Sequence, residues 1–343
     1  MIINNNKNKS QYSLKYFFIS FFLIFNSTAY ANSGHKHSSA RNTCLIEIGS
    51  QVFIQGANFT MGDDDTYHEE GPSHEITLTD FWIDAHEVTN KQFSKFASET
   101  GYITVAERTP DPKDWPGMPS ELLKPGSTLF VKPKNSNNIL SWWSYVEGVN
   151  WRHPYGPTSS IKGRDYYPVI HVAWEDAKAY ADWAGRSLPT EAQFELAARS
   201  QRNGTYAWDG EELAPKGHHY ANTWQGKFPI ENIADDDHLG LAPVGCYEPN
   251  DYGAYDLIGN VWEWTSNWYL PRHNPLDSHN PIGPTKDQSH QRTQTLIPLR
   301  VIKGGSFLCA PNYCIRYRPA ARQAADTGLG TSHIGFRTVT MKK

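Results

Sequence analysis

The sequence is poor in cysteine and methionine, with four of each among 343 residues, and it has no excess of basic residues. Its formal net charge is −4 and its pI is near 6.4, so it has no positive field to grip a phosphate backbone, and we expect no nucleic-acid partner. Charged residues make up only 20% and the mean hydropathy is −0.61. These values exclude a polytopic membrane protein and a highly charged disordered chain.

Aromatic residues, glycine and proline are abundant instead. Aromatic residues make up 13%, with 26 glycines and 22 prolines, which is typical of a loop-rich globular protein with little long helix. We find no internal repeat and no shift of composition within residues 48–343. The sequence therefore predicts one domain over residues 48–343.

Residues 1–31 have the pattern of an export signal. Basic residues precede an apolar stretch and a small-x-small motif; these are Lys7, Lys9 and Lys15, residues 16–25, and Ala29-Tyr30-Ala31. The apolar stretch is about half of the roughly 20 residues that a membrane-spanning helix needs. We therefore expect cleavage after Ala31 and an exported chain, periplasmic or secreted, without membrane attachment after cleavage. Residues 32–47 are small and polar and predict a flexible leader.

Three short helices are readable between β-like runs. Residues 90–100 and 175–184 place apolar side chains on one face, and each is followed by a glycine. The third helix begins after Thr190, which forms a capping box with Gln193. Residues 108–138 and 271–298 are polar, contain prolines and predict surface loops. Tryptophans 262, 264 and 268 are expected in the core.

Four cysteines are the candidates for redox or metal chemistry. In an exported protein cysteines usually pair, so a structural disulfide is the first interpretation. Cys309 and Cys314 are separated by a turn-forming Ala-Pro-Asn-Tyr segment. This spacing favours a small disulfide loop, but it also allows both sulfurs to bind one soft metal ion such as Cu(I). Tetrahedral zinc would need two further ligands that this segment does not supply.

The sequence around these cysteines, and several other blocks, carry a family resemblance. The blocks are Lys303-Gly304-Gly305-Ser306-Phe307-Leu308-Cys309, Tyr313-Cys314-Ile315-Arg316-Tyr317-Arg318, Ala320-Ala321-Arg322, Ile334-Gly335-Phe336-Arg337, Phe81-Trp82-Ile83-Asp84, Glu87-Val88-Thr89-Asn90, Asn150-Trp151-Arg152-His153-Pro154, Trp183-Ala184-Gly185, Leu188-Pro189-Thr190-Glu191 and Gly259-Asn260-Val261-Trp262-Glu263-Trp264. Together they strongly resemble the formylglycine-generating enzymes, also called sulfatase-modifying factors. Several blocks mark a wider superfamily with non-catalytic members, and the paired cysteines characterise the formylglycine-generating branch.

The resemblance implies a fold and an activity. The fold is a single α+β domain of low regular secondary structure, related to C-type lectin modules. The activity is aerobic, copper-dependent oxidation of a cysteine within a Cys-x-Pro-x-Arg motif of an unfolded sulfatase to Cα-formylglycine, with molecular oxygen as co-substrate. By position, Cys309 and Cys314 would hold Cu(I), and Ser306 would orient oxygen or a proton. On local sequence alone, Ser306 is equally well a turn residue. We expect a monomer.

The resemblance also implies two calcium sites. One set comprises Asn222, Thr223, Asp236 and His238, of which the second and fourth would contribute main-chain carbonyl oxygens. The other comprises Asp256, Gly259, Val261 and Glu263. Mixed carboxylate and carbonyl ligands are what Ca²⁺ prefers.

Some positions depart from the family pattern. Ala181, Ala198 and Pro319 stand where family members often carry structural cysteines, so the family's disulfides are in doubt here. Cys44 and Cys246 match no family position, and they either pair or stay unpaired. The Ala-Pro-Asn segment between Cys309 and Cys314 also departs. It leaves open a catalytically silent lectin-like or peptide-binding module. An iron-dependent sulfoxide synthase is disfavoured, because the histidine cluster that such members use is not found.

Overall fold

A computed structural model describes residues 44, 46–113, 119, 123–133, 142–202, 204–208, 210–293 and 297–341. The chain divides into two compact units, residues 1–38 and 39–343, and everything described below lies in the second unit. The predicted export signal and nearly all of the predicted leader lie outside the described residues. Among the described residues no helix combines the length and apolar character needed to cross a bilayer.

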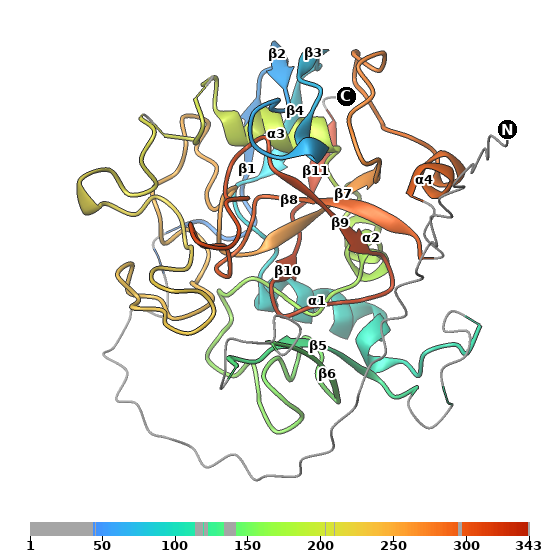
Figure 1. Cartoon of the computed structure of the whole chain (residues 1–343). Helices are drawn as coiled ribbons and strands as arrows, with labels where there is room; N and C mark the ends of the chain where they lie inside the picture. The colour runs from blue at the N-terminus through green and yellow to red at the C-terminus, as the bar shows by residue number, and fades with distance from the viewer. Residues whose placement is uncertain are drawn as a thin grey trace, which may run out of the picture. The chain divides into compact units, whose positions relative to one another are not determined.

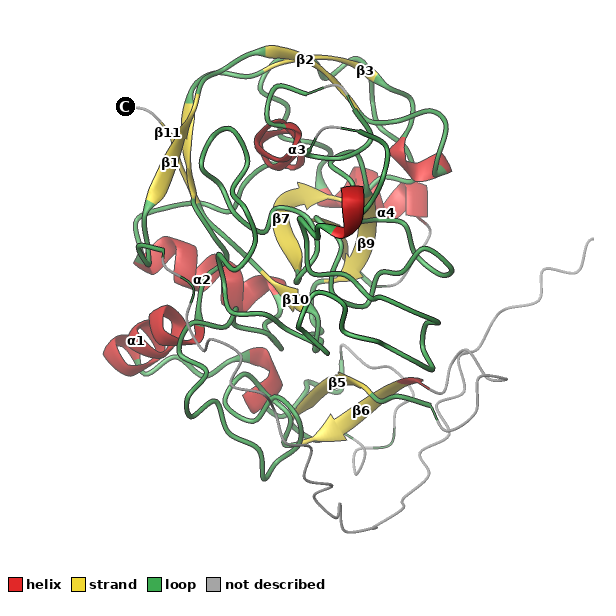
Figure 2. Ribbon diagram, turned by 90° about the vertical axis from the view of Figure 1, so that its left-hand side faces the viewer, coloured by secondary structure: helices red, strands yellow, loops and turns green. Residues whose placement is uncertain are grey.

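Short strands and helices are joined by long irregular segments (Figures 1 and 2). The strands are β1 (Gln51–Ile54), β2 (Asn58–Met61), β3 (His74–Thr77), β4 (Phe81–Asp84), β5 (Gly126–Phe130), β6 (Trp143–Glu147), β7 (Trp262–Trp268), β8 (Leu299–Lys303), β9 (Arg322–Asp326), β10 (Ile334–Gly335) and β11 (Val339–Met341). The helices are α1 (Asn90–Thr100), α2 (Trp174–Trp183), α3 (Glu191–Arg199) and α4 (Lys286–Thr293), with single 3-10 turns η1 (His68–Glu70), η2 (Val105–Glu107) and η5 (Pro215–Gly217). The expected α+β class with low regular secondary structure is confirmed.

The strands form four small sheets. The largest has the order β10-β7-β8-β9, in which β10 runs parallel to β7 and the other pairs are antiparallel. A second sheet has the order β1-β4-β11, and β2-β3 and β5-β6 are separate antiparallel pairs. Figure 2 shows β7 and β9 near the middle of the unit, between α3 and the β5-β6 pair. Strand β8 leads directly into the segment that carries Cys309 and Cys314.

The three expected helices are present, and local capping explains where they begin. Thr89 caps α1 and Thr190 caps α3, each in a reciprocal capping box with the glutamine three residues later. Helix α1 ends at Gly101, whose left-handed φ of 68° a residue with a Cβ rarely adopts. Helix α2 begins at Trp174, and the side chain of Asp176 accepts the main-chain N–H of Ala173 (2.8 Å).

Tryptophan packing anchors the core around β7, as expected for Trp262 and Trp264 but not for Trp268. Trp262 and Trp264 are buried, and the indole N–H of Trp264 donates to the carbonyl of Val172 (3.0 Å). Trp268 is only half-buried and stacks on the guanidinium of Arg300 (3.7 Å from the ring centroid). The same core takes in the apolar faces of α1 and α2 and the two cysteines of the candidate site.

The two polar insertions contain regular structure, so their prediction as surface loops is wrong in part. Strand β5 lies within residues 108–138, and helix α4 lies within 271–298. Ser127 of β5 donates to the carbonyl of Gly330 (2.6 Å), a contact across 203 residues that no local pattern reveals. For α4 a local signal existed, because Thr285 and Gln288 exchange the two hydrogen bonds of a capping box (2.8 and 3.2 Å).

Cys44 and Cys246 form a disulfide, which decides the alternative that the sequence left open. Their Cα atoms are 5.1 Å apart and they lie 202 residues apart in the sequence. The bond ties the start of the described chain to a loop next to Gly245, on which Ile46 packs. A cross-link over so long a loop restricts the unfolded chain strongly.

Replacing both Cys44 and Cys246 with serine is expected to lower the free energy of unfolding by about 2–4 kcal/mol, measured by urea titration. Dithiothreitol should destabilise the wild-type protein by a similar amount and leave the double variant unchanged. Equal stability of the wild-type protein with and without dithiothreitol would contradict this disulfide.

Candidate functional site

Cys309 and Cys314 are brought together with both thiols free. Their Sγ atoms lie 3.1 Å apart, in a contact in which either sulfur can donate. Both residues are buried, with 2% and 7% of their surface exposed. The loop between them is exposed from Pro311 to Tyr313, so the sulfur pair lies directly beneath a surface loop.

The surroundings of the two thiols differ in their electrostatics. A hydrogen bond from Cys309 is the main cause that lowers the pKa of Cys314 to about 6, and the main-chain N–H and guanidinium of Arg316 add to it. Burial raises the pKa of Cys309. The pair therefore favours a thiolate on Cys314 hydrogen-bonded to a thiol on Cys309. A thiolate is the form that acts as nucleophile or metal ligand.

Close backbone approach builds the turn before Cys309. Gly305 has a φ of 76°, and a Cβ there would lie 2.7 Å from the carbonyl oxygen of Arg316. Only glycine therefore lets residues 304–306 pack against the strand-like segment after Cys314. Ser306 is fully buried, its carbonyl accepts the N–H of Cys309 (2.8 Å), and its hydroxyl accepts the N–H of Leu308 (3.3 Å). These contacts are those of a turn residue, and a role in catalysis stays a prediction.

Three arginines after Cys314 pair with carboxylates. Arg316 pairs with Glu69, and its guanidinium lies 4.0 Å from the ring centroid of Tyr67. Arg318 binds both carboxylate oxygens of Glu70 (2.6 and 2.9 Å). It also pairs with Asp63 (3.0 Å).

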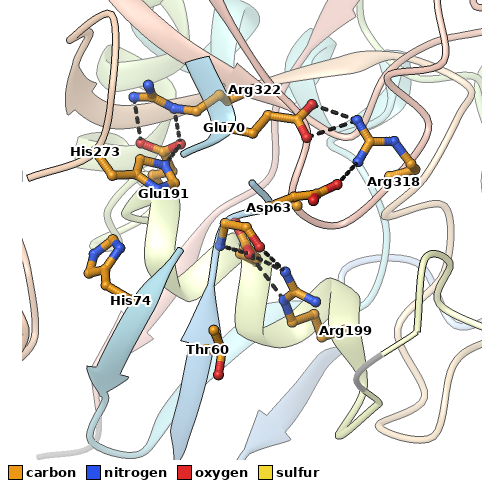
Figure 3. A network of polar contacts seen from close by, with 12 residues as sticks. Thr60, Asp63, Glu70, His74, Glu191, Arg199, His273, Arg318 and Arg322 are labelled. Carbon is orange, nitrogen blue, oxygen red and sulfur yellow. Dashed lines mark hydrogen bonds and ion pairs between the residues drawn. The ribbon is translucent and has the colours of Figure 1, made fainter. Parts of the chain in front are cut away.

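The third arginine, Arg322, extends this network to α3 (Figure 3). It binds Glu191 through two nitrogens (2.6 and 3.1 Å). On the other side of Glu191 lies the ring of His273 (Nε2 to Oε1, 3.4 Å), against which His74 packs edge to face. Through these pairs, the segment after Cys314 is fixed to η1 and to α3.

A buried ion pair fixes the strand that leads into the site. The Nζ of Lys303 lies 2.9 Å from an oxygen of Glu195, and neither side chain is exposed. Burial opposes ionisation of Glu195, but Lys303 and Arg199 outweigh it and lower the pKa of this carboxyl to about 2. Lys303 also donates to the carbonyl of Ala320 (3.2 Å), so it links β8 to the chain after the cysteines.

The side chain of Gln225 links two members of the first predicted calcium set, Thr223 and Asp236. Its Nε2 donates to Asp236 (2.9 Å) and to the main-chain carbonyl of Thr223. The main-chain N–H of His238 donates to the other oxygen of Asp236 (3.1 Å). The buried Oδ1 of Asn222 has no hydrogen-bond partner. A buried amide oxygen without a partner is the kind of ligand that an oxygen-ligated cation takes.

The second predicted calcium set surrounds a buried cluster of carboxylates. Asp256 is nine-tenths buried, and burial raises its pKa to about 6. Glu263 is fully buried and is bound by Arg337 through two nitrogens, each at 2.7 Å. Val261 is buried between them in the chain, and a Cβ on Gly259 would lie 2.4 Å from the carbonyl oxygen of Asn222. The two predicted sets are therefore in direct contact.

Sequence reasoning missed two polar residues of this cluster as site residues. Glu87 is completely buried and hydrogen-bonds with the side chain of Asp256; burial, with Asp256 and Glu263 nearby, raises its pKa well above the usual range. Asn260 donates to Glu87 (2.9 Å) and accepts from Asn222 (3.0 Å). Both residues stand in the blocks that carry the family resemblance, but their chain separation of 173 residues gives no sign of the contact.

The chemistry open to these groups follows from their donor atoms. In the described part of the chain, no group of three or more His, Cys, Asp and Glu side chains is arranged to hold a metal ion. The two sulfurs form a soft pair suited to Cu(I), and the oxygen clusters combine carboxylate, amide and main-chain oxygens suited to Ca²⁺. The donor atoms of the two kinds of site therefore suit different metals.

Comparisons with known proteins show similarity over most of the chain. The model of the family described as "Sulfatase-modifying factor enzyme 1-like domain" matches residues 36–342. The chain is 44% identical over 311 residues to the formylglycine-generating enzyme of Mus musculus, covering 90% of this chain and 78% of that protein. It is 44% identical over 301 residues to the enzyme of the same name from Mycobacterium tuberculosis, covering 84% and 96%.

Two further similarities set limits on what identity alone implies. The chain is 42% identical over 303 residues to a Bos taurus protein named inactive C-alpha-formylglycine-generating enzyme 2, covering 85% and 90%. Among solved structures, PvdO from Pseudomonas aeruginosa superposes with a TM-score of 0.60 at 21% identity, covering 85% of this chain and 94% of that one. The structural likeness supports the fold alone.

Replacing Lys303 with methionine is expected to lower the free energy of unfolding by about 3–5 kcal/mol, because it removes one partner of a buried ion pair. The matched control is Lys178→Met, whose exposed pair with Asp182 in α2 should contribute no more than about 0.5 kcal/mol. Chemical denaturation of both variants checks the difference, and equal losses would contradict it.

Proposed function

We propose that this chain, which belongs to the sulfatase-modifying factor family, oxidises a cysteine of an unfolded sulfatase to Cα-formylglycine with copper and molecular oxygen. The observation that carries this proposal is the pair of free sulfurs at 3.1 Å. Both sulfurs lie beneath an exposed loop, and the pair is what distinguishes the formylglycine-generating branch. Family identity alone is insufficient, since a relative named inactive is 42% identical.

Cys309 and Cys314 would hold the copper ion as Cu(I), and the soft donor pair fits that ion. When bound, copper supplies the one-electron chemistry toward dioxygen that ordinary side chains lack. Cys314, whose pKa is lowered to about 6 by its hydrogen bond from Cys309, is the sulfur prepared to bind as a thiolate. Arg316 stabilises that negative charge, and its own pairing with Glu69 keeps the guanidinium in place.

The reaction removes two electrons and two protons from the Cβ–Sγ unit of the substrate cysteine, and dioxygen accepts them and becomes hydrogen peroxide. Water then replaces sulfur at the resulting thioaldehyde, so hydrogen sulfide leaves and the aldehyde remains. Ser306, whose main-chain carbonyl accepts the N–H of Cys309, would orient oxygen or a proton through its hydroxyl. Its buried position keeps bulk water away from that hydroxyl.

The proposal includes the setting of the reaction. The substrate is an extended Cys-x-Pro-x-Arg segment of a sulfatase that has not yet folded, since a buried cysteine could not approach the sulfur pair. With the predicted export signal, the chain would act in the periplasm or outside the cell. The sulfatase would have to be exported by the same pathway, so that it meets this chain before it folds. The chain would act there as a monomer.

A Cys-x-Pro-x-Arg peptide tests this function. Incubated with the protein, copper and oxygen, the peptide should lose its thiol and gain a hydrazine-reactive aldehyde, followed by mass spectrometry. Cys309→Ser and Cys314→Ser should each abolish turnover while the near-ultraviolet circular dichroism stays unchanged. The double variant Cys44→Ser/Cys246→Ser is the matched control and should still convert the peptide. No aldehyde under conditions where the Mus musculus enzyme converts the same peptide would refute the proposal.

A second candidate, a catalytically silent peptide-binding module, is favoured by the 42% identity to the Bos taurus protein named inactive. The two functions differ in their affinity for Cu(I). Titration of the reduced protein against a strong Cu(I) chelator should give one tightly bound copper ion per chain if it is an oxidase. Peptide binding without copper binding would instead support the silent module.

We also propose that calcium occupies the two oxygen clusters. The unpaired oxygen of Asn222 and the buried carboxylate of Asp256 support this, because a cation would satisfy the first and neutralise the second. In a structure with so little regular secondary structure, such ions would stabilise the loops that they join.

Calcium at about 100 times its dissociation constant is expected to stabilise the protein by about 2.7 kcal/mol per site over the chelated form. Thermal unfolding with calcium, with magnesium and with a chelator measures this. Asp236→Ala should remove part of the calcium effect, whereas Asp237→Asn, at an exposed neighbour, should keep it. A calcium effect that survives Asp236→Ala in full would argue against the first site.

A further inference from the structure

Asn312 makes an unusual pair of contacts from within the loop between the two cysteines. Its Nδ2 donates to the main-chain carbonyl of Phe228 (3.2 Å), and its Oδ1 accepts the main-chain N–H of the same residue (3.3 Å). The side chain therefore binds both polar main-chain groups of Phe228, as a neighbouring strand would. Asn312 itself is exposed, so burial does not impose this arrangement.

The next residue strengthens the same attachment. The ring of Tyr313 stacks on the ring of Phe228, with centroids 4.3 Å apart and planes 12° apart. Trp142 contacts both rings edge to face, at 5.6 Å from Tyr313 and 5.4 Å from Phe228. Phe228 and Trp142 are buried and belong to one apolar cluster with Leu308 and Ala310. The tip of the loop thus rests on a fixed aromatic surface.

The segment that contains Phe228 also contacts the loop at its first residue, Cys309. The main-chain N–H of Trp224 donates to the carbonyl of Cys309 (2.9 Å). Residues 224–228 therefore hold the loop at Cys309 and again at Asn312, two residues before Cys314. Within the loop, the N–H of Cys314 donates to the carbonyl of Ala310 (2.8 Å).

We propose that Asn312 is a positioning residue that keeps the sulfur of Cys314 opposite that of Cys309 by binding the main chain of Phe228. A loop containing four residues between two cysteines has many conformations, and only some bring the sulfurs together. Each hydrogen bond and the ring stack select from these conformations, so the sulfur pair is ordered before any ligand arrives. That the two sulfurs serve to bind copper rests on the proposed function. The positioning role itself rests only on the contacts of the loop between Cys309 and Cys314.

The test uses the equilibrium between the dithiol and the disulfide of Cys309 and Cys314, which needs neither copper nor turnover. Full-length variants are equilibrated in glutathione buffers, the thiols are trapped by alkylation, and the Cys309–Cys314 peptide is quantified by mass spectrometry. Without Asn312, each sulfur spends less time opposite the other, so Asn312→Ala should lower the constant for disulfide closure about tenfold. Asn312→Asp removes the Nδ2 donor and should lower the constant as well.

Asn274→Ala is the matched control. Asn274 is also an exposed asparagine whose side chain accepts a main-chain N–H, that of Leu276 (3.3 Å), and its loss should leave the constant unchanged. Near-ultraviolet circular dichroism checks that each variant is folded. A constant that is unchanged or larger in both Asn312 variants would overturn the proposal.

Copper affinity separates this inference from the proposed function. If Cu(I) binds the wild-type protein, Asn312→Ala should weaken binding by a factor similar to the change in disulfide closure. If the wild-type protein binds no Cu(I) but the Asn312 variants still shift disulfide closure, the proposed function fails and the positioning role stands. Unaltered Cu(I) affinity in Asn312→Ala, with normal binding by the wild-type protein, would overturn the positioning role.

Discussion

Three buried carboxylates hold the chain on both sides of the cysteine pair, and the site depends on them. Glu195 pairs with Lys303 before the cysteines, and Glu70 and Glu191 pair with Arg318 and Arg322 after them. A buried ion pair adds little net stability over an apolar replacement, but an unpaired buried charge is costly. The segment from Lys303 to Arg322 can therefore be buried only where each of its buried basic side chains forms an ion pair with a carboxylate. This requirement sets where the sulfur pair lies.

The same rule explains how a chain with so little helix and sheet keeps a defined site. Irregular segments leave main-chain groups without strand or helix partners, and these groups must be satisfied individually. Here side chains do this: Ser306 binds the N–H of Leu308, Asn312 binds both main-chain groups of Phe228, and Arg322 binds the carbonyl of Leu270. The many side-chain contacts to main chain replace the ladders of a regular fold.

The predicted metal sites are connected to one another through such contacts. Asn260 binds Asn222 of one oxygen cluster and Glu87 of the other. Its carbonyl accepts the N–H of Phe307, two residues before Cys309. Residues 222–224 in turn join the first cluster to Trp224, which binds Cys309. A change in either oxygen cluster can therefore reach the cysteine loop through one or two residues.

The sequence by itself determined the features that depend on near neighbours and on composition. The cap of α3 follows from Thr190 and Gln193, three residues apart. The burial of Trp262 and Trp264 follows from their size, and the motif around Cys309 and Cys314 marks these two cysteines as the candidate site. Only the tertiary structure decided that Cys44 pairs with Cys246, that β5 forms inside a polar insertion, and that Glu87 joins Asp256. These contacts join residues 169 to 203 positions apart. Such pairs form because the whole core must bury its apolar surface and satisfy its polar groups at the same time. This requirement involves residues far apart in the sequence, so a short stretch of sequence does not reveal it.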